Sequence, residues 1–216
     1  MIIGDLLIVG EPPLKFIKAL GVIAIALHPS FDKIVTPGKS KESCVLCSLT
    51  VRDFLWKAGF KDARVVTVYT AIRAVGVDGV EIHSLGVGDH NGTVPTLGGR
   101  TLKDTPERWS GHMVVEVPSV GYMVDTTMFN MKRPAWPDLP GMIATPIERD
   151  GVTRSFGLDH LACIRTEIDD GVQLMLWWLV QPNERWRDAP DTERHRRLSV
   201  VKAMLRLFTT KAKKSR

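Results

Sequence analysis

Three residues, Cys44, His112 and Asp125, are of the types that together perform nucleophilic acyl transfer. A cysteine thiolate is a strong nucleophile, a histidine can accept and return a proton, and a carboxylate can hold the imidazole in the required orientation. Each of these residue types is common, so the order Cys, His, Asp is weak evidence. The interpretation therefore depends on the sequence around each residue.

Cys44 is expected at the start of a helix. Apolar residues recur at helical spacing through the segment from Ser40 to Ala58, and Gly59 is suited to end it. At a helix N-terminus the unpaired backbone N–H groups and the helix dipole stabilise a thiolate. Cys47 lies one turn deeper and is expected in the core. The alternative for Cys44 is a buried structural thiol.

His112 and Asp125 are expected on neighbouring strands. The segment from His112 to Val117, HMVVEV, predicts a strand, Pro118 and Gly121 mark a turn, and the next strand begins at Tyr122. Antiparallel pairing across this turn would bring His112 and Asp125 side by side. The alternatives are a strand histidine with a structural partner and an aspartate that begins a turn.

These blocks resemble the transglutaminase-like superfamily. The segment from Cys44 to Phe60 is similar to its catalytic helix, in which the cysteine opens a helix that ends at a glycine before a strand. HMVVEV is similar to the family's His-Ala-Trp-Val-Glu-Val strand, and GYMVDTT, ending at Thr127, to its Gly-Trp…Asp-Pro-Thr block. The resemblance covers roughly residues 40–130. It implies a papain-like core with Cys44 as nucleophile, His112 as base and acid, and Asp125 as the orienting acid.

Two positions depart from the family pattern. Val114 stands two residues after the histidine, where the family has an aromatic residue. Thr126 stands directly after the aspartate, where the family has a proline. Both departures concern details of the substrate site rather than the triad. The resemblance implies hydrolysis or acyl transfer on an amide of a peptide or protein, with no metal and no organic cofactor. The family also contains inactive binding proteins, so a non-catalytic binding module is the first alternative.

The remaining elements predict an α+β fold of N-terminal helices packed on an antiparallel sheet, with a C-terminal helix. A first helix is expected from Pro13 to Leu27, and a final one over roughly residues 192–209, with Leu198, Val201, Leu205 and Phe208 on one face. Strands are expected at residues 63–75, 112–117, from 122, near 162–168 and at 172–180. Asn91-Gly92 and Gly98-Gly99 are turn signals in a long hairpin, and Asp169-Asp170-Gly171 joins a second hairpin. We expect a catalytic domain at 1–190 and a basic helix and tail at 191–216.

Composition favours a cytoplasmic globular protein. The chain is 44% hydrophobic and 25% charged, which excludes disordered and collagen-like classes. The apolar stretch from Leu20 to Leu27 falls short of the roughly 18–20 residues of a membrane span. The start has no basic region and does not predict a signal peptide. Three cysteines argue against a disulfide scaffold. We therefore expect no transmembrane segment; the sequence does not predict an oligomeric state.

The basic charge lies at the C-terminal end. Residues 192–216 hold nine Lys and Arg against Glu193, a charge of +8, which leaves 5 − 8 = −3 for residues 1–191. This tail could bind nucleic acid, an anionic membrane or an acidic partner, but a docked helix with a solvated basic face is favoured. A nucleic-acid-associated protein is thus the second alternative function.

Three further residues have open roles. The spacing of Cys44 and Cys47, CxxC, occurs in zinc and redox sites, but zinc needs more ligands than this sequence offers nearby. Trp109 could line the pocket, donate its indole N–H to an oxyanion, or pack. Glu116, on the same strand face as His112, is either a neighbour of the site or a solvated residue.

Overall fold

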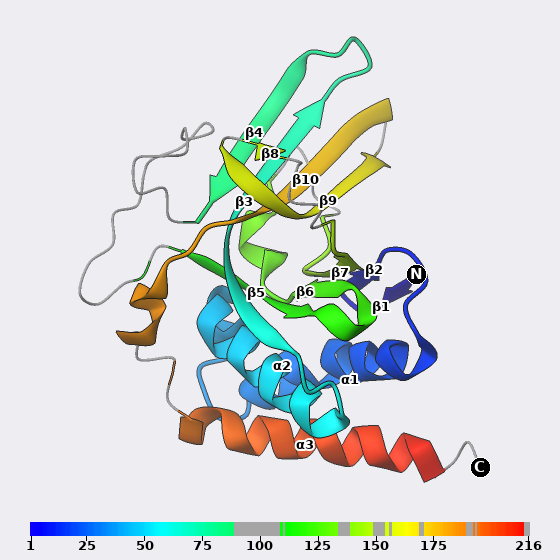
Figure 1. The fold of residues 1–216 in the computed structure, drawn as a ribbon, viewed down its shortest axis with the longest axis vertical. Helices are drawn as coiled ribbons and strands as arrows, with labels where there is room; N and C mark the ends of the chain where they lie inside the picture. The colour runs from blue at the N-terminus through cyan, green and yellow to red at the C-terminus, as the bar shows by residue number, and fades with distance from the viewer. Residues whose placement is uncertain are drawn as a thin grey trace.

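The computed structural model describes residues 1–88, 109, 111–133, 139–148, 154–155, 157–168, 171–188, 192 and 194–213. In this part of the chain a curled sheet packs against helices, which confirms the α+β class (Figure 1). The helices are α1 (Leu14–Phe31), α2 (Cys44–Ala58) and α3 (Arg194–Lys213). The strands are β1 (Ile2–Ile3), β2 (Leu6–Ile8), β3 (Arg64–Val75), β4 (Glu81–Val87), β5 (His112–Val117), β6 (Tyr122–Asp125), β7 (Met142–Pro146), β8 (Arg154–Ser155), β9 (Leu158–Ile168) and β10 (Val172–Val180).

The sheet is antiparallel except for one pair. Its order is β1-β2-β7-β6-β5-β3-β10-β9-β8, with β4 also beside β3, and only β2 and β7 run parallel among the described strands. The long strand β3 pairs with β5 through residues 64–68 and with β4 through 70–75. The expected pairings β5–β6 and β9–β10 are therefore present, and β3 also pairs with β4, a strand in the segment for which the sequence predicted a long-looped hairpin. The turn signals at 91–92 and 98–99, and Asp169-Asp170, lie outside the described residues.

Five strands, β1, β2, β4, β7 and β8, were not expected from the sequence. β1 and β2 use the first residues of the chain, and β7 follows the proline-rich segment that we predicted to be an irregular connection. β2 pairs with β7 in parallel, so residues about 135 positions apart in sequence form this edge. Local patterns do not encode such a pairing, because each partner is short and the contact is non-local.

Helix boundaries differ from the prediction in all three helices, and α3 continues to Lys213 rather than ending near residue 209. α1 continues to Phe31 and contains Pro29, because a proline in the last turn removes only one N–H and the buried side chains of Leu27 and Phe31 favour the helical path. α2 begins at Cys44 rather than Ser40, because residues 39–42 form a separate 3-10 helix and Ser43 is extended. The predicted stop at Gly59 is confirmed, with a left-handed φ of 102°.

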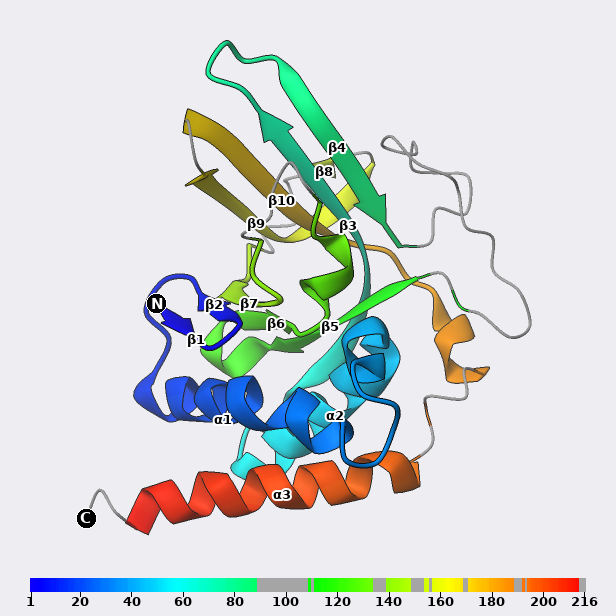
Figure 2. The ribbon, with the colours of Figure 1, turned by 180° about the vertical axis from the view of Figure 1, so that it is seen from behind.

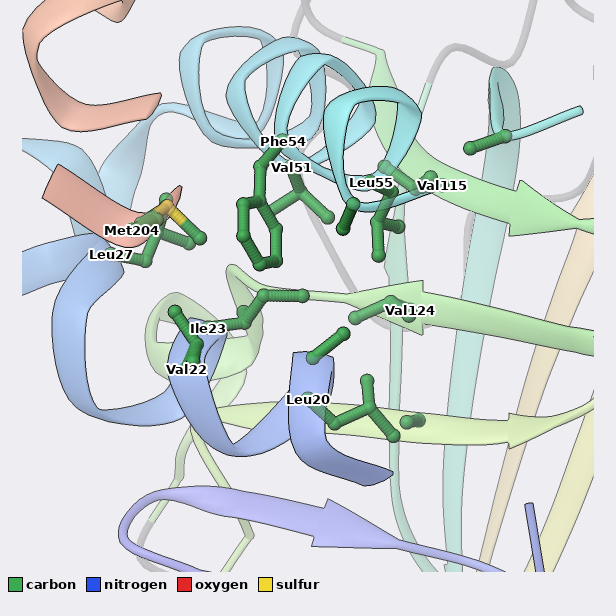
Figure 3. Close-up of a cluster of buried hydrophobic side chains, with 14 of the residues drawn as sticks. Leu20, Val22, Ile23, Leu27, Val51, Phe54, Leu55, Val115, Val124 and Met204 are labelled. Carbon is green, nitrogen blue, oxygen red and sulfur yellow. The ribbon is translucent and has the colours of Figure 1, made fainter. Parts of the chain in front are cut away.

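The main core lies between the sheet and the helices. Apolar side chains from α1 and α2 meet those of β5 and β6, and Met204 of α3 reaches Leu27 of α1 (Figure 3). A second cluster, on the other face of the curled sheet, contains Val68, Val114, Met123 and Trp178. α3 runs along the outside of α1 and α2 in both views (Figures 1 and 2). The sheet is thus packed on both faces near its centre.

The docked helix α3 uses most of the predicted face: Val201 is buried in the main core, and Leu205 and Phe208 pack against it. Its buried residues are Arg197, Val200, Val201 and Met204, whereas Leu198 is 40% exposed. The stripe at 197, 200, 201 and 204 has the spacing of one helix face, and Leu198 points away from it. The prediction for Leu198 was therefore wrong. The division into 1–190 and 191–216 stays a prediction, and Val200, Val201 and Met204 belong to the main core.

α1 is long and apolar enough, by length and composition alone, to cross a membrane, and it is the one such helix among the described residues. Half of it is buried inside the molecule, and Phe16, Leu20, Ile23 and Leu27 are fully buried in the main core. A core helix of this kind has the same composition as a marginal membrane span. The packing matches the buried helix that the sequence predicted.

Candidate active site

The structure places Cys44 at the first position of α2. Ser43, in extended conformation, caps the helix, and its hydroxyl accepts a hydrogen bond from the Leu46 N–H at 3.3 Å. The 3-10 helix before Ser43 sets the direction of entry and stops the helix from starting earlier. The half-buried Cys44 sulfur thus lies where α2 has unpaired N–H groups and partial positive charge.

His112 and Asp125 form a buried pair. His112 opens β5, Asp125 ends β6, and His112 Nε2 lies 2.7 Å from Asp125 Oδ2. Both side chains are almost entirely inaccessible. The antiparallel pairing of β5 with β6 brings them together across thirteen residues of sequence, as predicted. Because Nε2 is used by Asp125, Nδ1 is the ring nitrogen left for another partner.

Two further donors hold the Asp125 carboxylate. The indole N–H of Trp178 donates to Oδ2 at 2.8 Å, and the backbone N–H of Thr127 donates to Oδ1 at 3.0 Å. Trp178 belongs to β10 and is fully buried. We did not single it out from the sequence. The alternation of Leu174, Leu176 and Trp178 would have put it on an inward face, but its partner is set by long-range pairing.

The pair is charged. Burial alone would lower the pKa of His112, but the Asp125 carboxylate, to which it is hydrogen-bonded, and the Cys44 sulfur raise that pKa to about 10. Burial alone would raise the pKa of Asp125, but the His112 charge and the donors His112, Thr127 N–H and Trp178 lower it. At neutral pH, His112 is therefore an imidazolium and Asp125 a carboxylate.

Cys44 is the second partner of His112. A side-chain hydrogen bond and a charge interaction with Cys44 both contribute to the raised pKa of His112. The Cys44 sulfur also lies 3.8 Å from the carbonyl oxygen of Gly111, directly before His112. The structure thus brings all three predicted residues together in the order Cys44, His112, Asp125.

Trp109 packs beside the thiol. It contacts the apolar cluster of Val45, Leu49, Met113 and Trp186, which Cys44 also joins. Its ring lies so close to Gly111 that a Cβ there would come within 2.0 Å of it, which only glycine avoids. Its indole N–H is buried and has no partner among the described residues. The packing role is therefore observed, and the oxyanion role stays a prediction.

A buried histidine links the nucleophile to the acid. His28 Nε2 lies 3.0 Å from the carbonyl oxygen of Thr126, next to Asp125, and its Nδ1 lies 2.9 Å from the Ser40 hydroxyl, before α2. Burial lowers the pKa of His28, which keeps it neutral. A carbonyl only accepts, so Nε2 carries the proton and Nδ1 accepts from Ser40. His28 therefore fixes the segment before Cys44 against the segment after Asp125.

The other candidates have structural partners. Cys47 is fully buried, and its thiol donates to the Ser40 carbonyl oxygen at 3.1 Å. Glu116 is buried and pairs with Arg64 across the β3–β5 ladder at 2.8 Å, so it is not a solvated residue. Among the described residues, no three His, Cys, Asp or Glu side chains gather as they would around a metal ion.

One pocket of about 570 Å³ lies near the start of α2. It is bordered by residues of the loop after α1, by Ser43 and Leu46 of the α2 start and by Arg196 of α3. Cys44, His112 and Asp125 do not line it, so its position does not mark the triad. The candidate site rests on the geometry of the three side chains.

No protein-family model, curated protein or solved structure gives a significant match to this chain. The resemblance to the transglutaminase-like superfamily therefore rests on the sequence blocks around Cys44, His112 and Asp125. The geometry of the site is independent of that resemblance, because it depends only on where the fold places these three side chains.

Proposed function

We propose that this chain is a cysteine-dependent enzyme of the transglutaminase-like kind, which hydrolyses or transfers the acyl group of an amide in a peptide or protein. The observation that carries the proposal is the buried, charged His112–Asp125 pair beside a half-buried cysteine at a helix N-terminus. Burying two charges is costly, and such perturbed titratable groups concentrate at functional sites.

The reaction would proceed through an acyl-enzyme. The Cys44 thiolate attacks the amide carbonyl, and the Cys44 backbone N–H at the α2 start stabilises the oxyanion. His112, which already carries a proton, delivers it to the leaving amine and then removes one from water or from an acceptor amine. Asp125 holds the imidazole and its charge throughout. The residues need no metal or organic cofactor for these steps.

The two alternatives predict other behaviour. A non-catalytic binding module would need no charged His112–Asp125 pair, and a buried ion pair kept without use is costly. A nucleic-acid-associated protein would use α3, whose exposed cations include Arg194, Lys202 and Arg206. Salt-dependent binding of any DNA or RNA would favour that alternative. The prediction of a cytoplasmic location is kept as part of the proposal.

Acylation by an activated ester tests the proposal. We expect p-nitrophenyl acetate to release a burst of p-nitrophenolate stoichiometric with enzyme and to leave an acetyl group on Cys44, seen by peptide mass spectrometry. A library of peptides then identifies the amide substrate, with free primary amines added to separate transfer from hydrolysis. The matched control is Cys47→Ala, which should keep the burst.

Cys44→Ala should abolish the burst and the acetylation. A burst of unchanged size in Cys44→Ala, or no acyl-enzyme in a folded wild-type protein, would contradict the proposal.

A further inference from the structure

The proposed acyl transfer uses Cys44 but leaves Cys47 without a chemical role. The two cysteines form a Cys-x-x-Cys motif in the first turn of α2, and neither forms a disulfide in the structure. Dithiols at a helix start with this spacing suit reversible disulfide formation, because the first thiol is activated there and the second is one turn away. Their geometry and surroundings therefore decide whether they can act as a pair.

The separation is compatible with a bond. In an α-helix, residues three apart have Cα atoms about 5 Å from each other, given the rise and radius of the helix. A disulfide needs Cα atoms about 4.4–6.8 Å apart. Cβ atoms at this spacing in a helix are about 5–6 Å apart, whereas a disulfide needs them about 3.5–4.5 Å apart. The two Cβ atoms must therefore approach each other by about 1 Å or more for the bond to form. The start of α2 can adjust, because Ser43 is already extended and the first N–H groups have no intrahelical partner.

The two thiols differ in access and in hydrogen bonding. Cys44 is half-buried, beside the His112 imidazolium, so an oxidant in solution can reach it. Cys47 is fully buried and donates its S–H to the Ser40 carbonyl oxygen at 3.1 Å. An oxidant would therefore meet Cys44 first. Cys47 follows Cys44 by three residues in the same helix, so it is the cysteine nearest in sequence to an oxidised Cys44.

We infer that Cys44 and Cys47 are a redox pair, in which Cys47 resolves an oxidised Cys44 by closing an intrahelical disulfide. The inference rests on the nucleophilic Cys44 of the proposed function. The Cys44 thiolate attacks a peroxide oxygen, the S–O bond forms, the O–O bond breaks, and the peroxide is reduced to hydroxide, which takes a proton from solvent. Cys47 then loses its proton and attacks the sulfenic sulfur, the S–S bond forms, and the departing hydroxide leaves with that proton as water.

The consequence is reversible protection of the nucleophile. The disulfide removes Cys44 from acyl transfer and shields it from further oxidation to sulfinic acid, which thiols do not reverse. A dithiol reductant restores both cysteines. Ser40 connects this change to the site, since its carbonyl accepts from Cys47 and its hydroxyl pairs with His28.

The test uses the full chain carrying Cys163→Ser, so that only the two cysteines of α2 remain. Lys41 and Arg52 flank the pair, so trypsin releases both cysteines in one peptide, residues 42–52. The protein is treated with hydrogen peroxide, blocked with N-ethylmaleimide and digested, with and without later dithiothreitol. We expect a monomer on a non-reducing gel and an unblocked peptide lighter than the dithiol form by two hydrogen atoms. Dithiothreitol should restore Cys44 alkylation fully.

Cys47→Ser, and Cys47→Ala as a second variant, should instead accumulate Cys44 sulfinic acid and lose most of the alkylation irreversibly. The inference is overturned if wild-type Cys44 is oxidised without the internal link, if peroxide leaves Cys44 untouched, or if the Cys47 variants recover as fully as wild type. Failure of the proposed function gives a different pattern, in which the disulfide forms but the activated ester leaves no acyl group on Cys44.

Discussion

At the scale of single residues, the Asp125 carboxylate receives more donors than orientation of His112 alone would need. Oδ2 accepts from His112 and Trp178, and Oδ1 accepts from the Thr127 N–H. Charge-assisted hydrogen bonds of this kind keep a buried carboxylate ionised. Trp178 thus acts on His112 through Asp125, as a positioning residue.

Trp178→Phe should slow turnover by about tenfold or more, because a hydrogen bond to a charged group contributes about 1.5–3 kcal/mol. Loss of the indole N–H raises the pKa of Asp125, so the acid limb of the pH profile for Cys44 alkylation should move to higher pH. The matched control is Trp177→Phe, since Trp177 packs on the other sheet face against Tyr69 and Leu179. An unmoved profile in a folded Trp178→Phe protein would exclude the positioning role.

Asp125→Asn should leave a folded protein that turns over far more slowly. The amide keeps the shape and can still accept from the Thr127 N–H, but it cannot balance the imidazolium and can favour the wrong tautomer. The equivalent change in a serine protease triad costs about 10⁴-fold. Circular dichroism checks the fold, and the rate of deacylation of acetylated Cys44 measures the effect. A rate equal to wild type would show that Asp125 does not orient His112.

The local sequence was sufficient to predict the three residues, Cys44, His112 and Asp125, that the structure brings together. Cys44 begins a helix that ends at Gly59. His112 and Asp125 lie on two strands that a short turn connects. All of these signals lie within a few residues of the side chain concerned. Trp178 and His28 were not predicted, because Trp178 meets Asp125 53 residues away and His28 meets Thr126 98 residues away. Contacts over such separations have no local signature.

At the scale of elements, α3 is part of the core rather than an appendage. Val200, Val201 and Met204 are buried among the side chains of α1 and α2, and Arg197 pairs with Asp53 of α2 at 2.6 Å. Periodicity predicted the helix and, in Val201, Leu205 and Phe208, most of its packed face, but not that Leu198 is exposed, because the fit to α1 and α2 decides which apolar residue at the edge of the face is covered. Local sequence likewise did not predict the pairing of β2 with β7, because the two strands are far apart in the chain.

Met204→Ala should lower the free energy of unfolding by about 2–5 kcal/mol, since it removes a fully buried side chain from the main core. The matched control on the same helix is Leu207→Ala, because Leu207 is 39% exposed and should cost less than about 0.5 kcal/mol. Urea unfolding followed by circular dichroism measures both. Equal effects of the two substitutions would contradict the observed docking of α3.

At the scale of the whole molecule, the curled sheet and the helices fix four distant segments around one charged pair. α2 supplies Cys44, β5 and β6 supply His112 and Asp125, and β10 supplies Trp178. His28 of α1 joins Ser40, just before α2, to Thr126, just after β6. The charge of the pair must therefore be visible in the stability of the entire fold.

The pair should make stability depend on pH. The folded pKa of His112, about 10, lies above its unfolded value of roughly 6.5, so its contribution is fully present below pH 6.5 and is lost as pH rises through 10. The pKa of Asp125 is lowered, so its contribution is present above its unfolded value, roughly 3.9, and is lost as pH falls through the folded value.

Comparison with a double variant, His112→Gln with Asp125→Asn, isolates this effect, because His28 titrates in both proteins. The difference in melting temperature, wild type minus variant, should be largest near pH 5–6 and should shrink steadily toward pH 10. Calorimetry across this range measures it. A difference that is constant with pH would show that the pair is uncharged.

The central claim, that Cys44 is the nucleophile and His112 activates it, is tested most directly by the reactivity of the Cys44 thiol. A limiting dose of iodoacetamide at pH 6–7, followed by peptide mass spectrometry, reports which of the three cysteines reacts. We predict alkylation at Cys44, with Cys47 and Cys163 unmodified, and loss of that alkylation in His112→Ala. Preferential modification of Cys47, or labelling of Cys44 that is undiminished without His112, would contradict the assignment of the site.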